Sequence, residues 1–210
     1  MEDVRKFYCN VQTIEDFFSK HGHLLYKKDP RLVFNTDESS SVSSKKFKAI
    51  TLNEKGPCTV TVSAKELHIS AVYCYNAAGF KLKPLIILPG LKNLSSELTL
   101  LNGFFASQKS GWMTSKLFVS FCIFFVCNIN NYRLSLPQNI RNEKIILLVD
   151  NHTSRCNSWA IEFLARHNID LLTFPPHTTH VLQPFDVCVA GPLKTRMATF
   201  KISELTRSVS

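Results

Sequence analysis

One uninterrupted apolar run constrains the fold of this chain more strongly than its other segments. Residues 145–149 read Ile-Ile-Leu-Leu-Val, with charged residues on both sides. A run without alternation is typical of a strand that is buried on both faces of a sheet. A helical pattern over residues 158–167 follows, and then a second apolar run at 169–174, which ends at Pro175. This order predicts a strand–helix–strand unit with parallel strands and a right-handed crossover.

The segments before this unit predict a helix and then antiparallel strands. Residues 1–30 carry apolar side chains at steps of three and four, which predicts a helix, and residues 38–46 read as a serine-rich loop. Strands are predicted at residues 31–37, 58–63, 67–75 and 80–88. The last two form a hairpin around the turn at 76–79, and Pro84 places the second of them at a sheet edge or a bulge. We therefore expect an α/β fold in which a mixed sheet, antiparallel strands first and then the βαβ unit, is flanked by helices.

A strongly apolar segment at residues 117–129 raises the question of a membrane span. A helix that crosses a bilayer needs about 20 apolar residues. Polar residues from Asn128 to Arg133 end this run early. We therefore expect a buried helix, with Trp112 and the neighbouring phenylalanines in the core, and no membrane partner.

The charge balance predicts an anionic partner. Lys and Arg number 25 against 16 Asp and Glu, a net charge of +9. A protein this basic tends to associate with polyanions, of which nucleic acid is the commonest inside a cell. Charge alone fits a merely basic protein equally well. The lysines that could line DNA phosphates are Lys45, Lys46, Lys48, Lys81 and Lys83.

Three aspartates stand where sheets with helical crossovers collect ligands. Asp37 and Asp150 each end a predicted strand, and Asp186 lies beyond the second strand of the βαβ unit. If the first two strands are neighbours, Asp37 and Asp150 face each other, and one of them must be protonated unless a cation neutralises the pair. Hard oxygen ligands favour Mg²⁺ or Mn²⁺, and a pair of such ions is the apparatus for attack on a phosphodiester. The alternative stays open that each acid only forms a turn or caps a helix.

The blocks that carry these acids resemble a known family. Residues 34–39, 147–154 and 174–186 are similar to the DDE superfamily endonuclease domain of pogo/Tigger/Jerky-type transposases, a Tc1/mariner-like group with an RNase H-like fold. Residues 75–87 and 111–114 resemble the pattern between these blocks. The resemblance divides the chain into a helical linker at 1–30, a catalytic domain at 31–200 and a short tail at 201–210.

The resemblance also implies roles for particular residues. Asp37, Asp150 and Asp186 match the first, second and third metal-binding acids, which hold two Mg²⁺ (or Mn²⁺) ions for DNA cleavage and strand transfer. Asn151 is a candidate partner of Asp150 or a helix cap, and Gln183 is expected to set the turn that presents Asp186. The implied partners are transposon ends and target DNA, bound through a basic surface. A homodimer and a nuclear location follow from the same resemblance.

Some features depart from the family and keep a second hypothesis open. Arg155 stands where such proteins often have His, no helix-turn-helix domain precedes the catalytic blocks, and little chain follows Asp186. The intact acids favour an active nuclease, whereas the departures favour a domesticated or remnant protein that binds DNA or protein partners without catalysis. An RNase H-type hydrolase would share the acids but not these blocks. His152, His177 and His180 lack a partnering Cys pair, so we expect them to form hydrogen bonds rather than a zinc site.

Overall fold

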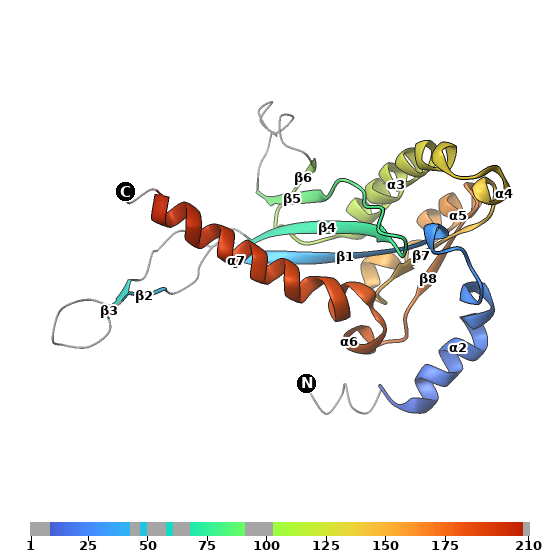
Figure 1. Cartoon of the computed structure of the whole chain (residues 1–210), viewed down its shortest axis with the longest axis horizontal. Helices are drawn as coiled ribbons and strands as arrows, with labels where there is room; N and C mark the ends of the chain where they lie inside the picture. The colour runs from blue at the N-terminus through green and yellow to red at the C-terminus, as the bar shows by residue number, and fades with distance from the viewer. Residues whose placement is uncertain (1–8, 43–46, 50–57, 61–67, 91–102, 208–210) are drawn as a thin grey trace. The chain divides into compact units, whose positions relative to one another are not determined.

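The computed structural model describes residues 9–42, 47–49, 58–60, 68–90 and 103–207 (Figure 1). The chain divides into two compact units. The first unit comprises residues 1–37, 73–82 and 114–210, and the second comprises residues 38–72 and 83–113. Asp37, Asp150 and Asp186 all belong to the first unit.

The strands form a mixed six-stranded sheet in the order β6-β5-β4-β1-β7-β8. In the first unit β7 (Ile145–Val149) pairs in parallel with β1 (Val33–Val42) on one side and with β8 (Ile169–Thr173) on the other. Helix α5 (Ser158–Arg166) connects β7 to β8. Every residue of β7 is buried. The predicted strand–helix–strand unit is therefore confirmed, as is the α/β fold with a mixed sheet and flanking helices.

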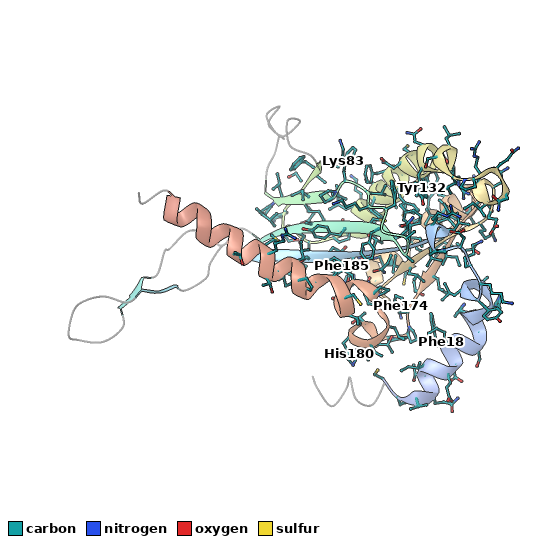
Figure 2. All side chains as sticks on the ribbon, in the orientation of Figure 1. Phe18, Lys83, Tyr132, Phe174, His180 and Phe185 are labelled. Atoms are coloured by element: carbon teal, nitrogen blue, oxygen red, sulfur yellow. The ribbon has the colours of Figure 1, made fainter. Side chains whose placement is uncertain are left out.

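Helix α2 (Val11–Leu25) covers one face of β7 and β8. Its residue Phe17 packs in a buried cluster with Ile146, Leu148 and Phe174, the last of which is labelled in Figure 2. The Asn10 side chain begins the helix by accepting a hydrogen bond from the backbone N–H of Thr13. The predicted N-terminal helix is confirmed for residues 11–25, and its first part at 1–8 lies outside the described residues.

Helix α3 (Ser115–Ser135) packs against α5 in the first unit. Its buried side chains recur at helical spacing: Phe118, Phe121, Cys122, Phe125, Val126 and Ile129. The Phe34 ring of β1 meets the Phe125 ring edge-on, 5.4 Å between centroids. Among the described residues α3 is the one helix long and apolar enough to cross a membrane, and this stripe of it is buried within the protein. The predicted buried helix is confirmed, but Trp112 is 57% exposed, so its placement in the core is wrong.

Short elements complete the first unit. They are η1 (Pro30–Leu32), α4 (Gln138–Arg141), η3 (Thr153–Arg155), α6 (Thr179–Leu182), the π-helical turn η4 (Phe185–Val189) and α7 (Ala190–Arg207). Asn168 follows α5 with a positive φ of 61°, a conformation that asparagine sometimes adopts just after a helix. The strand β4 (His68–Asn76) contributes its last residues to this unit.

The second unit corrects several strand predictions. The hairpin is confirmed, because Ser70 of β4 pairs antiparallel with Ile87 of β5 (Leu85–Pro89). However, β5 begins after Pro84 and pairs on its other side with β6 (Phe104–Gln108), so the edge alternative is wrong. The bulge alternative agrees with the pairing, because one more residue lies between Lys81 and Leu85 than between their partners Tyr75 and Val72. The strand begins after Pro84 because proline has no N–H to donate to a neighbouring strand. The Pro84 carbonyl oxygen still accepts a hydrogen bond from the N–H of Phe104 at 2.9 Å.

A further stretch that was predicted as a loop belongs to a strand. β1 continues through 42, although residues from 38 onward were expected to leave the sheet. The serine-rich composition misled this prediction, because pairing with neighbouring strands overrides weak local preference. Strand β3 (Cys58–Val60) covers the start of the predicted strand at 58–63 and pairs with β2 (Phe47–Ala49), while residues 61–67 lie outside the described residues.

Candidate catalytic site

A buried network of hydrogen bonds is centred on Asn35 of β1. Its Nδ2 donates to the Leu148 carbonyl oxygen at 3.1 Å and to Gln183 Oε1 at 2.9 Å. Its Oδ1 accepts from the Tyr75 hydroxyl at 3.1 Å and from the backbone N–H of Phe185 at 3.0 Å. Asn35 is 3% exposed and Gln183 is fully buried. This single amide therefore connects β1 with three other segments: β4, β7 and the stretch that leads into η4.

Three of these four segments, β1, β7 and η4, carry or adjoin the predicted acids. Asn35 stands two residues before Asp37. Its partner on β7 stands two residues before Asp150, and its partner on η4 stands one residue before Asp186. Gln183 strengthens the arrangement, because its Nε2 also donates to the carbonyl of Thr36 at 3.3 Å. Packing also holds η4 in place. The Phe185 ring, labelled in Figure 2, is fully buried and stacks on a tyrosine ring of β4, with 5.6 Å between the ring centroids.

Asp37 lies inside β1 and not at its end, which corrects the sequence prediction. β1 and β7 are neighbours, as the prediction required, and Asn35 pairs with Leu148 in register. This pairing ends two residues before Asp37 on β1 and two residues before Asp150. Asp37 is 8% exposed, whereas Asp186 lies in η4 and is exposed.

Two of the acids influence the pKa of the Tyr75 hydroxyl. Burial is the main cause that raises the pKa of its hydroxyl above the ordinary value. The charges of Cys188 and Asp37, and more weakly that of Asp186, raise this pKa further. Asp37 and Asp186 therefore both lie within electrostatic range of one hydroxyl, which itself donates to Asn35.

Asp150 is held by a cation from its own loop. The Nε of Arg155 lies 3.1 Å from Asp150 Oδ1, and the Arg155 side chain is 2% exposed. The guanidinium also lies over the Phe118 ring, 5.0 Å from its centroid. Asp150 itself keeps 22% of its side chain exposed.

A hollow lies beside this loop within the first unit. Its volume is about 340 Å³, and its lining includes Phe17, Lys20, His21, Asn151 and Phe174. Burial first, and then the charges of Lys20 and His23, lower the pKa of His21. Asn151 is exposed in this lining, and α5 is capped by Asn157, so the predicted alternative of Asn151 as the cap of that helix is wrong. His152 bonds to Ser154 through its Nδ1 at 2.9 Å.

The three aspartates are suitable metal ligands by type, but not by their positions. Three carboxylates are the chemistry that Mg²⁺ and Mn²⁺ prefer. Within residues 9–42, 68–90 and 103–207, however, no three His, Cys, Asp or Glu side chains are grouped closely enough to hold an ion. The segments converge, but the side chains as placed here do not form a shared metal site.

Comparison with protein families decides the identity of this chain. The family described as DDE superfamily endonuclease matches residues 66–203, well over half of the chain. The chain belongs to this family. The match contains Asp150 and Asp186, whereas the block around Asp37 lies before it.

Solved transposase structures share the fold of this DDE domain. The Mos1 transposase paired-end complex with left transposon end is 12% identical, with a TM-score of 0.58 over 89% of this chain and 47% of that chain. The Mos1 paired end complex with Mn is 13% identical, with a TM-score of 0.58, over 88% of this chain and 49% of that chain. The catalytic domain of Mos1 mariner transposase is 14% identical, with a TM-score of 0.53, over 89% and 69%. This chain therefore spans about half the length of the transposases in the two complexes.

A curated protein also matches over a limited stretch. The MFS-type transporter clz9 of Cochliobolus lunatus is 28% identical over 129 residues, which cover 60% of this chain and 13% of that protein. The likeness therefore concerns one segment of a much longer protein.

Sequence reasoning missed three residues of the site in the DDE domain. Asn35 and Tyr75 were given no role, although both stand inside blocks that resemble the family. Arg155 was noted only as a departure from the usual His. The sequence spacing could have indicated its ion pair, because an arginine five residues after a candidate acid can reach that acid across a short turn.

Proposed function

We propose that this DDE domain is the catalytic domain of a transposase, which cleaves DNA phosphodiesters and transfers strands with the help of Mg²⁺ or Mn²⁺. Asp37, Asp150 and Asp186 are the proposed metal ligands. The observation that carries the proposal is the Asn35 network, which ties together the three segments that bear these acids.

The metal ions would supply the chemistry that carboxylates alone lack. A bound divalent ion generates a nucleophile at neutral pH and stabilises the charge on the leaving oxygen. The chain itself supplies the frame: the Asn35 and Gln183 amides hold β1, β7 and η4 together, and the buried partners keep water out of that frame. The carboxylates must draw together from the present arrangement before they share an ion.

The hollow beside Asn151 is the proposed contact for the DNA backbone. Lys20 stands on one wall, and Asn151 directly follows the second acid. A cation and an amide donor are groups that commonly bind phosphate oxygens. The net charge of +9 favours the same partner. We propose transposon ends and target DNA as substrates, a homodimer as the working form and the nucleus as its location.

A second candidate function has its own observation. The Arg155 guanidinium already neutralises Asp150, as a metal would. A remnant transposase domain that binds DNA or protein partners without cutting needs no metal at Asp150, so its ion pair with Arg155 could stay closed. We rank this function second because all three acids are present.

A plasmid-nicking assay with Mg²⁺ or Mn²⁺ tests the proposal. We expect the wild-type protein to nick DNA, and Asp150→Asn to lose about a thousandfold or more of the rate, because the metal supplies several kcal/mol to the transition state. Asp170→Asn is the matched control. Asp170 is an acid of β8 whose ion pair is with Lys144, at 3.1 Å, and it should keep the wild-type rate.

Two results of this assay would count against the proposal. Equal nicking by the wild type and Asp150→Asn would remove the second acid from catalysis. Absence of metal-dependent nicking in the folded wild type, with DNA binding retained in a gel-shift assay, would support the non-catalytic function instead.

A further inference from the structure

Arg155 is the largest side chain of the described residues that is fully buried. A guanidinium that leaves water must be paired, because an isolated buried charge is very costly. Arg155 meets this need with the Asp150 carboxylate at 3.1 Å and with the Ser154 hydroxyl at 3.4 Å. The Phe118 ring adds a cation–π contact at 5.0 Å. The ion pair is therefore built into the interior.

The local chain dictates this placement. The 3₁₀ turn η3 spans Thr153–Arg155, and the backbone N–H of Arg155 donates to the His152 carbonyl at 2.8 Å. This turn folds the loop back, so that the arginine reaches the acid five residues earlier. The guanidinium then lies over the Phe118 ring of α3. The ion pair forms within one short loop and needs no external partner.

We propose that Arg155 is an internal cation that competes with divalent metal ions for Asp150. This inference rests on the proposed function, because it assigns Asp150 as a metal ligand. The guanidinium occupies Oδ1, and a divalent ion that approaches the exposed part of the same carboxylate meets its positive charge. Like charges at this distance repel strongly in a partly buried site. Metal binding therefore weakens in proportion to the charge of Arg155.

The charge of Arg155 can be separated from its hydrogen bond. Nε is one donor to one oxygen of Asp150. A neutral amide at position 155 can donate in the same way and hold the carboxylate without repelling a metal. A positioning role and a competing role thus predict different results for Arg155→Gln: unchanged or weaker metal binding in the first case and tighter binding in the second.

Mn²⁺ binding measured by electron paramagnetic resonance distinguishes these roles without any DNA cleavage. We expect Arg155→Gln to bind Mn²⁺ about tenfold or more tightly than the wild type, because one repelling charge is removed. Arg155→Lys keeps the positive charge and should therefore bind Mn²⁺ more weakly than Arg155→Gln does. Circular dichroism checks that each variant is folded. Equal or weaker Mn²⁺ binding by folded Arg155→Gln would overturn the inference.

The wild-type protein gives a second readout if Arg155→Gln does not fold. The Arg155 Nε–H signal in a nitrogen–proton spectrum should be protected from solvent exchange without metal and lose this protection as Mg²⁺ is added. A protected signal at saturating Mg²⁺ would overturn the inference.

The results also separate this inference from the proposed function. Mn²⁺ binding of equal strength in both proteins, with nicking intact, overturns the inference alone. Tighter binding by Arg155→Gln without nicking in either protein supports the inference and overturns the nuclease. No Mn²⁺ binding in either folded protein overturns both.

Discussion

The Asn35 network and the Arg155 ion pair are two buried polar arrangements near the end of β7, and they are built differently. The Asn35 network is neutral and joins residues 40 to 150 positions apart in the sequence. The Arg155 pair is charged and joins residues five positions apart. A long-range neutral network closes the fold, whereas a local charged pair can change its partner without opening the sheet. Stability should therefore depend mainly on the first arrangement, and the response to metal on the second.

Removal of the central amide should have the largest effect on stability. We expect Asn35→Ala to lower the free energy of unfolding by about 3 kcal/mol or more, because it leaves several buried polar groups without their partner, each at a cost of about 1–3 kcal/mol. Urea unfolding followed by circular dichroism measures this loss. Asn130→Ala, at an exposed position of α3, is the control and should change stability by less than about 0.5 kcal/mol. Similar losses in both variants would show that the network does not close the fold.

The second amide should matter less than the first, but should be coupled to it. We expect Gln183→Ala to cost about 2 kcal/mol, since Asn35 keeps its bond to the Leu148 carbonyl. In a double-mutant cycle, Asn35→Ala with Gln183→Ala should lose about 1 kcal/mol less than the two single losses together. Additive losses would mean that the two amides act independently, against the 2.9 Å bond between them.

Much of the fold around β7 could be predicted from the sequence. Periodicity revealed β7, α5 and β8, because a strand buried on both faces and an amphipathic helix leave direct marks in the order of apolar residues. The same reasoning found the buried helix α3. It could not find the continuation of β1 beyond Asp37, since serines in a paired strand look the same as serines in a loop.

The candidate site was predictable only in part. The roles of Asp37, Asp150 and Asp186 came from the resemblance to the DDE family. The parallel pairing of β1 with β7 brings the segments of the first two acids side by side. The role of Asn35 depends on partners more than a hundred residues away, so no local pattern marks it. The assignment of the three acids as metal ligands stays a prediction.

The aromatic support of the charged arrangement can be measured by itself. Phe118 and Phe121 are both buried on α3, and Phe118 lies under the Arg155 guanidinium. Each Phe→Leu change loses a similar volume of packing. We expect Phe118→Leu to cost about 0.5–2 kcal/mol more than Phe121→Leu in urea unfolding, because it also removes a cation–π contact. Equal costs would show that the ring contributes packing alone.

A partly exposed ion pair completes the comparison and should have the smallest effect. The Arg31 guanidinium lies 2.7 Å from Asp29, whose carboxylate also accepts the backbone N–H of Arg31. The side-chain bond first, and then the backbone bond, lower the pKa of Asp29 from 3.8 to about 2. The pair therefore stabilises the fold above pH 3.8, and this contribution is lost as the pH falls through 2. Solvent screening keeps the contribution small.

Titration of the Asp29 carboxyl carbon by nuclear magnetic resonance tests this pair. The wild-type midpoint should lie near 2, and in Arg31→Gln it should rise toward 3.8, because the charged donor is gone while the backbone donor remains. A wild-type midpoint near 4 would mean that solvent already separates the two charges. Water can screen Asp29 and Arg31 in this way, whereas the Arg155 charge is buried and keeps its influence on Asp150.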